Sequence, residues 1–267
     1  MAYHMRFSLE YNPFLKNSKD IIIETKDYKQ IQQRLKFLSD NNGFGIITGE
    51  PGRGKTTAVR HWAASLSPSR FKVVYTSLST LTLNEFYRHL AEEFGLEPKF
   101  RKSQNYKLIQ AEINRYHIEK KITPVFVIDE ANYINSSILN EFKMLFNFEM
   151  DSRDRAIVLL IGGFSLNTTL NRASNEPLRQ RITMNYSLNN LNQEDSKIYI
   201  KTRLQAAGAP ETIFDEQAIK SITNASNGIP RIINKICDMC LRIGDAQKIE
   251  TIDSEIILMA VNEIELS

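Results

Sequence analysis

The apolar and polar positions of residues 1–190 follow two alternating patterns. Short apolar runs, such as 156–161, are separated by stretches in which apolar residues recur at helical spacing, as Ile31, Leu35 and Leu38 do. Strands that alternate with helices in this way are typical of βαβ units and predict a parallel sheet flanked by helices. We expect strands at 45–48, 71–76, 125–128, 156–161 and 183–188, and helices at 27–40, 55–65, 82–94, 106–119 and 136–148.

Beyond Leu191 the strand-like runs stop and only helical spacing remains. Asp215 and Asp253 are typical N-caps, and Pro230 suits the first turn of a helix. We expect helices at 194–207, 215–225, 230–242 and 253–264. The predicted organisation is an N-terminal arm (1–20), an α/β core (21–190) and a small all-helical lid domain (191–267).

The composition is that of a globular protein. With 267 residues, 42% hydrophobic and 24% charged, the chain can bury a sizeable core. No apolar run approaches the ~18 residues that cross a bilayer, and residues 1–10 contain no apolar signal core. We therefore expect a soluble, cytoplasmic protein without a membrane partner. The formal net charge of +3 permits nucleic-acid binding but does not by itself predict it.

The two cysteines, Cys237 and Cys240, have the spacing of a redox or zinc pair. A zinc site of this type needs two further ligands, and the histidines are scattered without metal-ligand spacing. Both cysteines also occupy apolar positions of the predicted helix 230–242. We interpret them as buried helix residues.

A glycine-rich loop lies between the first predicted strand and the next helix. It matches the pattern G-x-x-x-x-G-K-[ST], in which backbone amides and a helix N-terminus surround phosphates. A turn that is glycine-rich by chance is the alternative, but the position between a strand and a helix is the one that phosphate binding requires. We predict ATP and Mg²⁺ as cofactors, with Lys55 on the β- and γ-phosphates and Thr56 on the metal. The nucleotide-binding residues predicted here are Gly49, Glu50, Pro51, Gly52, Arg53, Gly54, Lys55, Thr56 and Thr57.

The apolar strand 125–128 ends in two acidic residues, Asp129 and Glu130. A carboxylate at the end of a buried strand can hold magnesium opposite such a loop. The next carboxylate is placed to act as general base on the attacking water. An acidic pair at a strand end is often only solvated, but its position downstream of the glycine-rich loop favours the catalytic interpretation.

Three arginines are candidates for contact with nucleotide. Arg179 and Arg181 precede the last predicted strand, where an arginine can neutralise charge on a transferring phosphoryl group, often across a subunit boundary. Arg231 stands at a helix start in the lid domain, within Gly228-Ile229-Pro230-Arg231. Solvated surface arginines are the alternative interpretation for all three.

Residues 96–121 are locally basic and interleaved with the aromatic residues Phe100 and Tyr106. Such a stretch can bind a phosphate backbone, although a solvated helix face has the same composition. The candidate DNA-binding residues are Lys99, Arg101, Lys102 and Lys107.

In this order the motifs resemble those of the AAA+ ATPases, and in particular the branch that contains the ExeA-like secretion ATPases and the transposition regulators TniB, TnsC and MuB. The resemblance covers nearly the whole chain. The motifs that support it are Tyr11-Asn12-Pro13-Phe14, Gly43 to Glu50, Val127 to Ala131, Leu178 to Ile182, Tyr199 to Gly208 and Gly228 to Arg231.

The resemblance implies roles for several residues. Arg181 is the preferred trans-acting arginine finger, with Arg179 as the alternative, and Arg231 becomes the sensor-two arginine. The arm is expected near the adenine site, with Asn12, Pro13 and Phe14 in contact with nucleotide. One departure concerns the polar sensor-one residue after the fourth strand, where this chain has Gly162-Gly163; Ser165 or Asn167 is a possible substitute, and slow hydrolysis is the other outcome.

The resemblance further implies a process. We expect an ATPase that assembles on double-stranded DNA as a homo-oligomeric ring or filament and recruits or stimulates a transposase. An ATPase of a secretion or envelope-assembly system is the main alternative. A helicase-loader-like protein and a small-molecule P-loop kinase are further alternatives.

Overall fold

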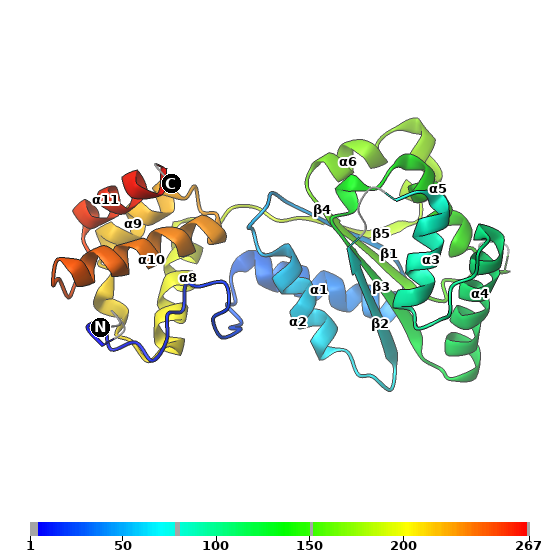
Figure 1. Ribbon diagram of the computed structural model, residues 1–267, viewed down its shortest axis with the longest axis horizontal. Coiled ribbons are helices and arrows are strands. Elements are labelled where there is room, and N and C mark those ends of the chain that lie inside the picture. The colour runs from blue at the N-terminus through cyan, green and yellow to red at the C-terminus, as the bar shows by residue number, and fades with distance from the viewer. Residues whose placement is uncertain (1–4, 78–80, 150–151, 266–267) are drawn as a thin grey trace. The chain divides into compact units, whose positions relative to one another are not determined.

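The computed structural model describes residues 5–77, 81–149 and 152–265. The chain forms two compact units (Figure 1). The α/β unit consists of Gln30–Pro51 and Lys55–Leu188, and the helical unit consists of Met1–Lys29, Gly52–Gly54 and Asn189–Ser267. The predicted fold class, a parallel sheet flanked by helices and followed by a helical part, is confirmed.

The α/β unit is built on a five-stranded sheet in the order β2-β3-β4-β1-β5, and all the pairings between neighbouring strands are parallel. Residues of β1 and β4 are buried throughout, as expected for inner strands covered on both faces. Each strand lies within about two residues of its predicted limits. The strands are β1 (Gly43–Thr48), β2 (Phe71–Ser77), β3 (Thr123–Asp129), β4 (Ile157–Gly162) and β5 (Ile182–Ser187).

The helices of this unit match the predicted ones with two differences. α4 begins at Lys102 rather than near residue 106, and it continues into a π-helical turn, η1 (Arg115–Glu119). Two short helices, α6 (Ser165–Leu170) and α7 (Glu176–Arg179), were not predicted. The other helices are α1 (Lys26–Asn41), α2 (Lys55–Ser65), α3 (Leu83–Glu93), α4 (Lys102–Asn114) and α5 (Ser136–Leu145), with the 3-10 turns η2 (Ala131–Tyr133) and η4 (Ala173–Asn175).

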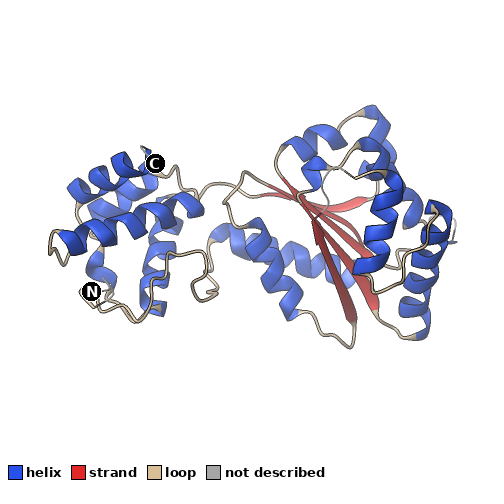
Figure 2. Ribbon diagram, in the orientation of Figure 1, coloured by secondary structure: helices blue, strands red, loops and turns tan. Residues whose placement is uncertain are grey.

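Alternate residues of the strands face opposite sides of the sheet, and helices cover both sides (Figure 2). Phe44, Phe126 and Val158 belong to the buried cluster that α3, α4 and α5 complete. The opposite face of β1 meets α1, because a Cβ on Gly45 would lie only 2.6 Å from Leu38 Cδ2. The sheet is therefore held between two helical layers.

The helical unit has its own buried core, and the N-terminal segment contributes to it. Phe7, Leu9 and Phe14 are buried in the same cluster as the lid helices. Sequence analysis assigned 1–20 to a separate arm and 21–190 to the core, whereas residues up to Lys29 group with the helical unit. The lid helices are α8 (Gln193–Ala206), α9 (Glu216–Ala225), α10 (Pro230–Ala246) and α11 (Ser254–Glu265), with the 3-10 turn η5 (Glu211–Ile213).

Cys237 and Cys240 are fully buried on α10 and form no disulfide, as predicted for helix-core residues. Burial raises the pKa of the Cys240 thiol to about 12, so this sulfur stays protonated at neutral pH. In the part of the chain that the structure describes, no helix is long and apolar enough to span a membrane.

Candidate nucleotide-binding site

The predicted phosphate and magnesium residues meet at one edge of the sheet. Because the strands are parallel, the segments that follow β1, β3 and β4 leave the sheet at the same edge. The glycine-rich loop follows Thr48 of β1, and Asp129 is the last residue of β3. This carboxyl edge is where open α/β sheets bind ligands.

The loop joins β1 to α2 and requires glycine at two positions. Gly52 has φ +85° and Gly54 has φ +91°, a conformation that other residues rarely adopt. A Cβ on Gly54 would meet no atom within 4 Å, so the backbone conformation alone requires glycine there. The first turn of α2 follows directly and contains no acidic side chain, which leaves its N-terminal partial charge available to an anion.

Lys55 curls back over the loop. Its ammonium donates hydrogen bonds to the carbonyl oxygens of Gly49 at 2.7 Å and Glu50 at 3.0 Å. These bonds hold the cation at the loop that is predicted to surround phosphates. Of the remaining predicted loop residues, Glu50, Pro51 and Thr57 are exposed and Arg53 is half-buried.

Thr56 and Asp129 are brought together by a hydrogen bond in which Thr56 Oγ1 donates to Asp129 Oδ2 at 2.9 Å. Asp129 is buried, and its Oδ1 accepts a hydrogen bond from the backbone N–H of Glu130 at 2.8 Å. A hydroxyl and a carboxylate oxygen side by side fit Mg²⁺, which is held by one or two carboxylates together with substrate phosphates. Among the described residues, no group of three or more His, Cys, Asp and Glu side chains could hold a metal.

Glu130 directly follows the strand in an unusual backbone conformation. Its φ is +53°, in the left-handed region, and its side chain is exposed. Non-glycine residues in this region are uncommon and cluster at functional sites. The turn separates the exposed carboxylate of Glu130 from the buried one of Asp129, so the two acidic residues have different environments.

Tyr75 is a residue of this site that sequence analysis missed. It lies on β2, the edge strand next to β3, and its hydroxyl donates to Asp129 Oδ2 at 2.9 Å. Burial, this hydrogen bond and the charges of Asp129 and Glu130 together raise the pKa of Tyr75 to about 12. The hydroxyl is therefore protonated at neutral pH and acts as a donor. An aromatic hydroxyl near the end of a strand next to an acidic strand end is the only signal that the sequence offered.

Close packing explains the first of the two glycines at the expected sensor-one position, Gly162. The N–H of Gly163 donates to Asn132 Oδ1 at 2.8 Å, and a Cβ on Gly162 would lie 2.7 Å from that oxygen. Of the two proposed substitutes, Asn167 on α6 contacts the last residue of β1: its Nδ2 donates to Thr48 Oγ1 at 3.0 Å. The geometry thus favours Asn167 over Ser165.

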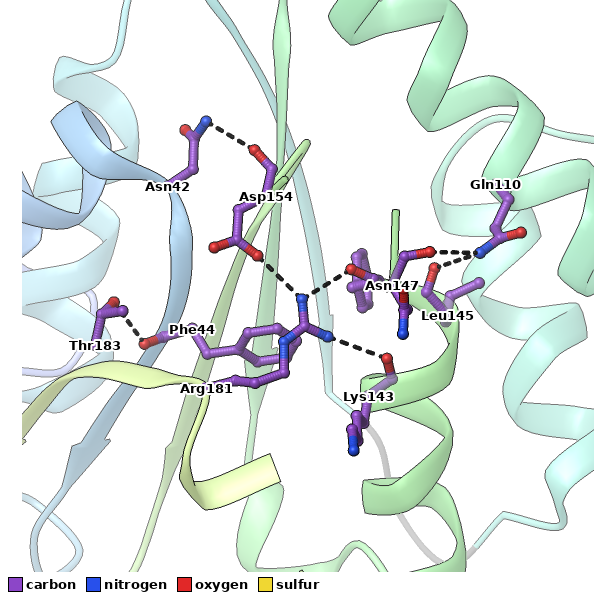
Figure 3. A network of polar contacts seen from close by, with 10 residues as sticks. Asn42, Phe44, Gln110, Lys143, Leu145, Asn147, Asp154, Arg181 and Thr183 are labelled. Atoms are coloured by element: carbon purple, nitrogen blue, oxygen red, sulfur yellow. Dashed lines mark hydrogen bonds and ion pairs between the residues drawn. The ribbon is translucent and has the colours of Figure 1, made fainter. Parts of the chain in front are cut away.

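Arg181 directly precedes β5, so it lies at the amino ends of the strands, opposite the candidate site. It takes part there in a network of contacts inside the α/β unit (Figure 3). Its guanidinium donates to the carbonyls of Lys143 at 3.1 Å and Phe146 at 3.0 Å and pairs with Asp154 at 3.1 Å. It also stacks over the Phe44 ring, 4.8 Å from the centroid, and its side chain is only 12% exposed. In this structure Arg181 anchors the start of β5.

Arg179, the alternative finger, has a different environment. It is the last residue of α7 and is exposed, with one hydrogen bond from its Nη1 to the Asn171 carbonyl at 3.3 Å. Its guanidinium is therefore far less restrained than that of Arg181.

The remaining predicted nucleotide residues lie in the helical unit. Asn12 is buried; its Nδ2 donates to Asp238 and its Oδ1 accepts from the N–H of Phe14 at 2.9 Å. Arg203 donates to the Pro13 carbonyl. The second residue of α10, Arg231, donates its backbone N–H at 3.3 Å to the carbonyl of Gly52, which groups with this unit.

The predicted DNA-binding residues lie close in the sequence to an exposed aromatic side chain. Phe100 is 83% exposed. The backbone of Lys99, the preceding residue, makes two hydrogen bonds with the buried side-chain amide of Asn105: its N–H donates to Oδ1, and its carbonyl accepts from Nδ2. Lys99 pairs with Glu97 at 3.0 Å and Lys102 with Glu141 at 2.6 Å. Arg101 and Lys107 are exposed.

Comparison with known proteins identifies relatives of two kinds. Residues 38–170 match the family model of the AAA domain. The chain is 31% identical over 245 residues to general secretion pathway protein A of Aeromonas hydrophila. The aligned region covers 90% of this chain and 44% of that protein. It is 27% identical over 216 residues to the Mu-like prophage FluMu DNA transposition protein B of Haemophilus influenzae, covering 78% of this chain and 68% of that protein.

Among solved structures, the ORC2 protein of Aeropyrum pernix in its ADPNP–ADP complexes has a TM-score of 0.67 at 15% identity and covers 94% of this chain and 71% of that one. At this identity the likeness concerns the fold alone. The chain spans less than half the length of the secretion protein, so that protein's name alone does not define the activity of this one.

The contacts of Arg181 predict a large loss of stability on substitution. Arg181→Ala should lower the free energy of unfolding by about 2–4 kcal/mol, because it leaves two carbonyls and one carboxylate without their charged donor. Arg179→Ala, the matched control, should change it by less than about 0.5 kcal/mol. Urea denaturation of both variants measures this; equal effects would contradict an anchoring role for Arg181.

Proposed function

This chain belongs to the AAA ATPases, and we propose that it hydrolyses ATP within a homo-oligomer that assembles on double-stranded DNA and regulates a transposase. The single observation that supports the chemistry best is the Thr56–Asp129 hydrogen bond beside the glycine-rich loop. The similarity to DNA transposition protein B supports the process.

In the proposed reaction, this chain's residues bind, orient and move a proton. The loop amides and the N-terminus of α2 bind the phosphates, and Lys55 exchanges its two carbonyl partners for phosphate oxygens. Thr56 and Asp129 would hold a divalent cation, which would supply charge neutralisation on the phosphates. Glu130 orients the attacking water and accepts its proton. Asn167 is the candidate for the polar sensor.

The proposed residues of the helical unit are expected to contact the rest of the nucleotide. Arg231 would act as the sensor-two arginine, and Asn12, Pro13 and Phe14 would contribute to the adenine site. These assignments rest on the motifs and remain predictions.

Two substitutions separate nucleotide binding from hydrolysis. Lys55→Ala should weaken ATP binding by at least about 100-fold, because a charge-assisted bond to phosphate is lost. Glu130→Gln should bind ATP as wild type does and reduce turnover by about 10²–10⁴-fold, because the general base is removed. Equilibrium binding of a fluorescent ATP analogue and phosphate release measure the two effects. Equal turnover of Glu130→Gln and wild type would remove the base assignment.

For the trans-acting arginine, we propose Arg179 in preference to Arg181. A finger has to reach a phosphoryl group on a neighbouring subunit. Arg181 would have to abandon an ion pair, two carbonyl bonds and a ring contact to do so, whereas Arg179 would give up one hydrogen bond.

Mixing two inactive variants tests this assignment. Arg179→Ala subunits keep the base, and Glu130→Gln subunits keep the finger, so about a quarter of the interfaces in a random mixture combine both intact groups. The mixture should hydrolyse ATP faster than either variant alone, while Arg172→Ala, another exposed arginine, should behave as wild type. A mixture no faster than its components would contradict a trans role for Arg179.

The exposed cations near Phe100 in the sequence support a DNA surface on the α/β unit. Because Lys99 and Lys102 are engaged in ion pairs, we assign phosphate contact mainly to Arg101 and Lys107. The exposed ring of Phe100 can add an apolar or stacking contact with bases.

Salt dependence tests the DNA surface. Arg101→Ala should weaken ATP-dependent DNA binding and reduce the slope of log K against log salt by about one, the change expected for one lost phosphate contact. Lys36→Ala, an exposed lysine on α1, is the control and should leave the slope unchanged. An unchanged slope for Arg101→Ala would move the DNA surface elsewhere.

A second function is favoured by the 31% identity to general secretion pathway protein A. In that case the chain would be the ATPase of a secretion system, and its turnover would not respond to DNA. Stimulation of hydrolysis by double-stranded DNA distinguishes the two proposals.

A further inference from the structure

Tyr75 occupies a position at the candidate magnesium site that its packing does not require. It lies on the edge strand β2, and the residue is 50% exposed. A half-exposed ring contributes little to the core, so packing does not explain why a tyrosine occupies this position. The informative part of the side chain is its hydroxyl. That hydroxyl donates to Asp129 Oδ2 at 2.9 Å.

The Asp129 carboxylate is held by three donors from this chain. Thr56 Oγ1 and the Tyr75 hydroxyl both donate to Oδ2, and the Glu130 N–H donates to Oδ1. The three donors come from α2, β2 and the turn after β3, so they restrain the carboxylate from different directions. Such outer partners fix the orientation of groups that hold a metal.

Stabilisation of the sheet does not explain the Tyr75–Asp129 hydrogen bond well. β2 and β3 already pair in register along their length, from Phe71 opposite Thr123 to Ser77 opposite Asp129. One further hydrogen bond at a half-exposed position adds little to that ladder. The same bond has a direct effect on the carboxylate, because it shares the oxygen that Thr56 contacts.

We propose that Tyr75 is a positioning residue that orients the Asp129 carboxylate, and through it the Thr56 hydroxyl, toward a nucleotide-bound divalent cation. The proposal rests on the proposed nucleotide-binding function. It predicts that Tyr75 affects the part of nucleotide affinity that depends on Mg²⁺ and leaves the metal-independent part unchanged.

Tyr75→Phe tests the proposal through binding rather than turnover. Affinity for a fluorescent ATP analogue is measured in EDTA and across a Mg²⁺ titration. In EDTA the variant should match wild type within about twofold; the Mg²⁺ concentration at half-effect should rise about 10-fold, the lower end of the range for outer partners of metal sites. Tyr133→Phe, an exposed tyrosine on η2, is the matched control and should behave as wild type in both conditions.

Several outcomes would overturn the proposal. An unchanged Mg²⁺ titration for Tyr75→Phe would do so, as would an equal loss of affinity in EDTA and in Mg²⁺, which indicates general disruption of the fold. If the substitution still shifts the Mg²⁺ titration in an Asp129→Asn background, the effect does not pass through the carboxylate. Failure of wild type to bind nucleotide in any condition would instead refute the proposed function itself.

Discussion

The candidate site depends on one hydrogen bond, between Thr56 and Asp129. The two residues belong to segments at the ends of strands that are not neighbours in the sheet. Thr56 follows β1 and Asp129 ends β3, and β4 lies between these strands in the sheet. Their 2.9 Å hydrogen bond therefore spans the end of β4. That strand ends at Gly162, where a Cβ would lie 2.7 Å from Asn132 Oδ1. A side chain there would push against the turn that follows Glu130, so the glycine keeps both acidic residues in place.

The same constraint excludes a side chain at one of the two glycines in the expected sensor-one position. A side chain at Gly162, the last residue of β4, would occupy the space that Asn132 takes, and Asn132 also accepts the N–H of Gly163. Because both positions are glycine, a polar side chain that contacts the nucleotide has to come from further along the chain. Asn167, bonded to Thr48 at the end of β1, is placed to do so. Tyr75 adds a donor to Asp129 from β2, on the side of β3 away from β4.

Much of the fold could be predicted from the sequence, because buried parallel strands and amphipathic helices have distinct periodicities. The loop, Asp129 and Glu130 were predicted from local spacing alone, and the structure brings Thr56 of this loop region next to Asp129. The short helices α6 and α7 were missed because a few residues give no periodic signal. The restraint on Arg181 and the role of Asn132 could not be predicted, since both depend on contacts between distant segments. The motif made Arg181 the preferred finger, and only its surroundings favour Arg179.

The proposed function requires that ATP binding at the carboxyl end of the sheet controls assembly on DNA. Sedimentation of the purified chain with double-stranded DNA, in the presence of ATP, ADP or no nucleotide at low salt, tests it most directly. We expect large protein–DNA assemblies with ATP and their loss with ADP. Absence of DNA binding in every nucleotide state would contradict it and favour the secretion-type ATPase.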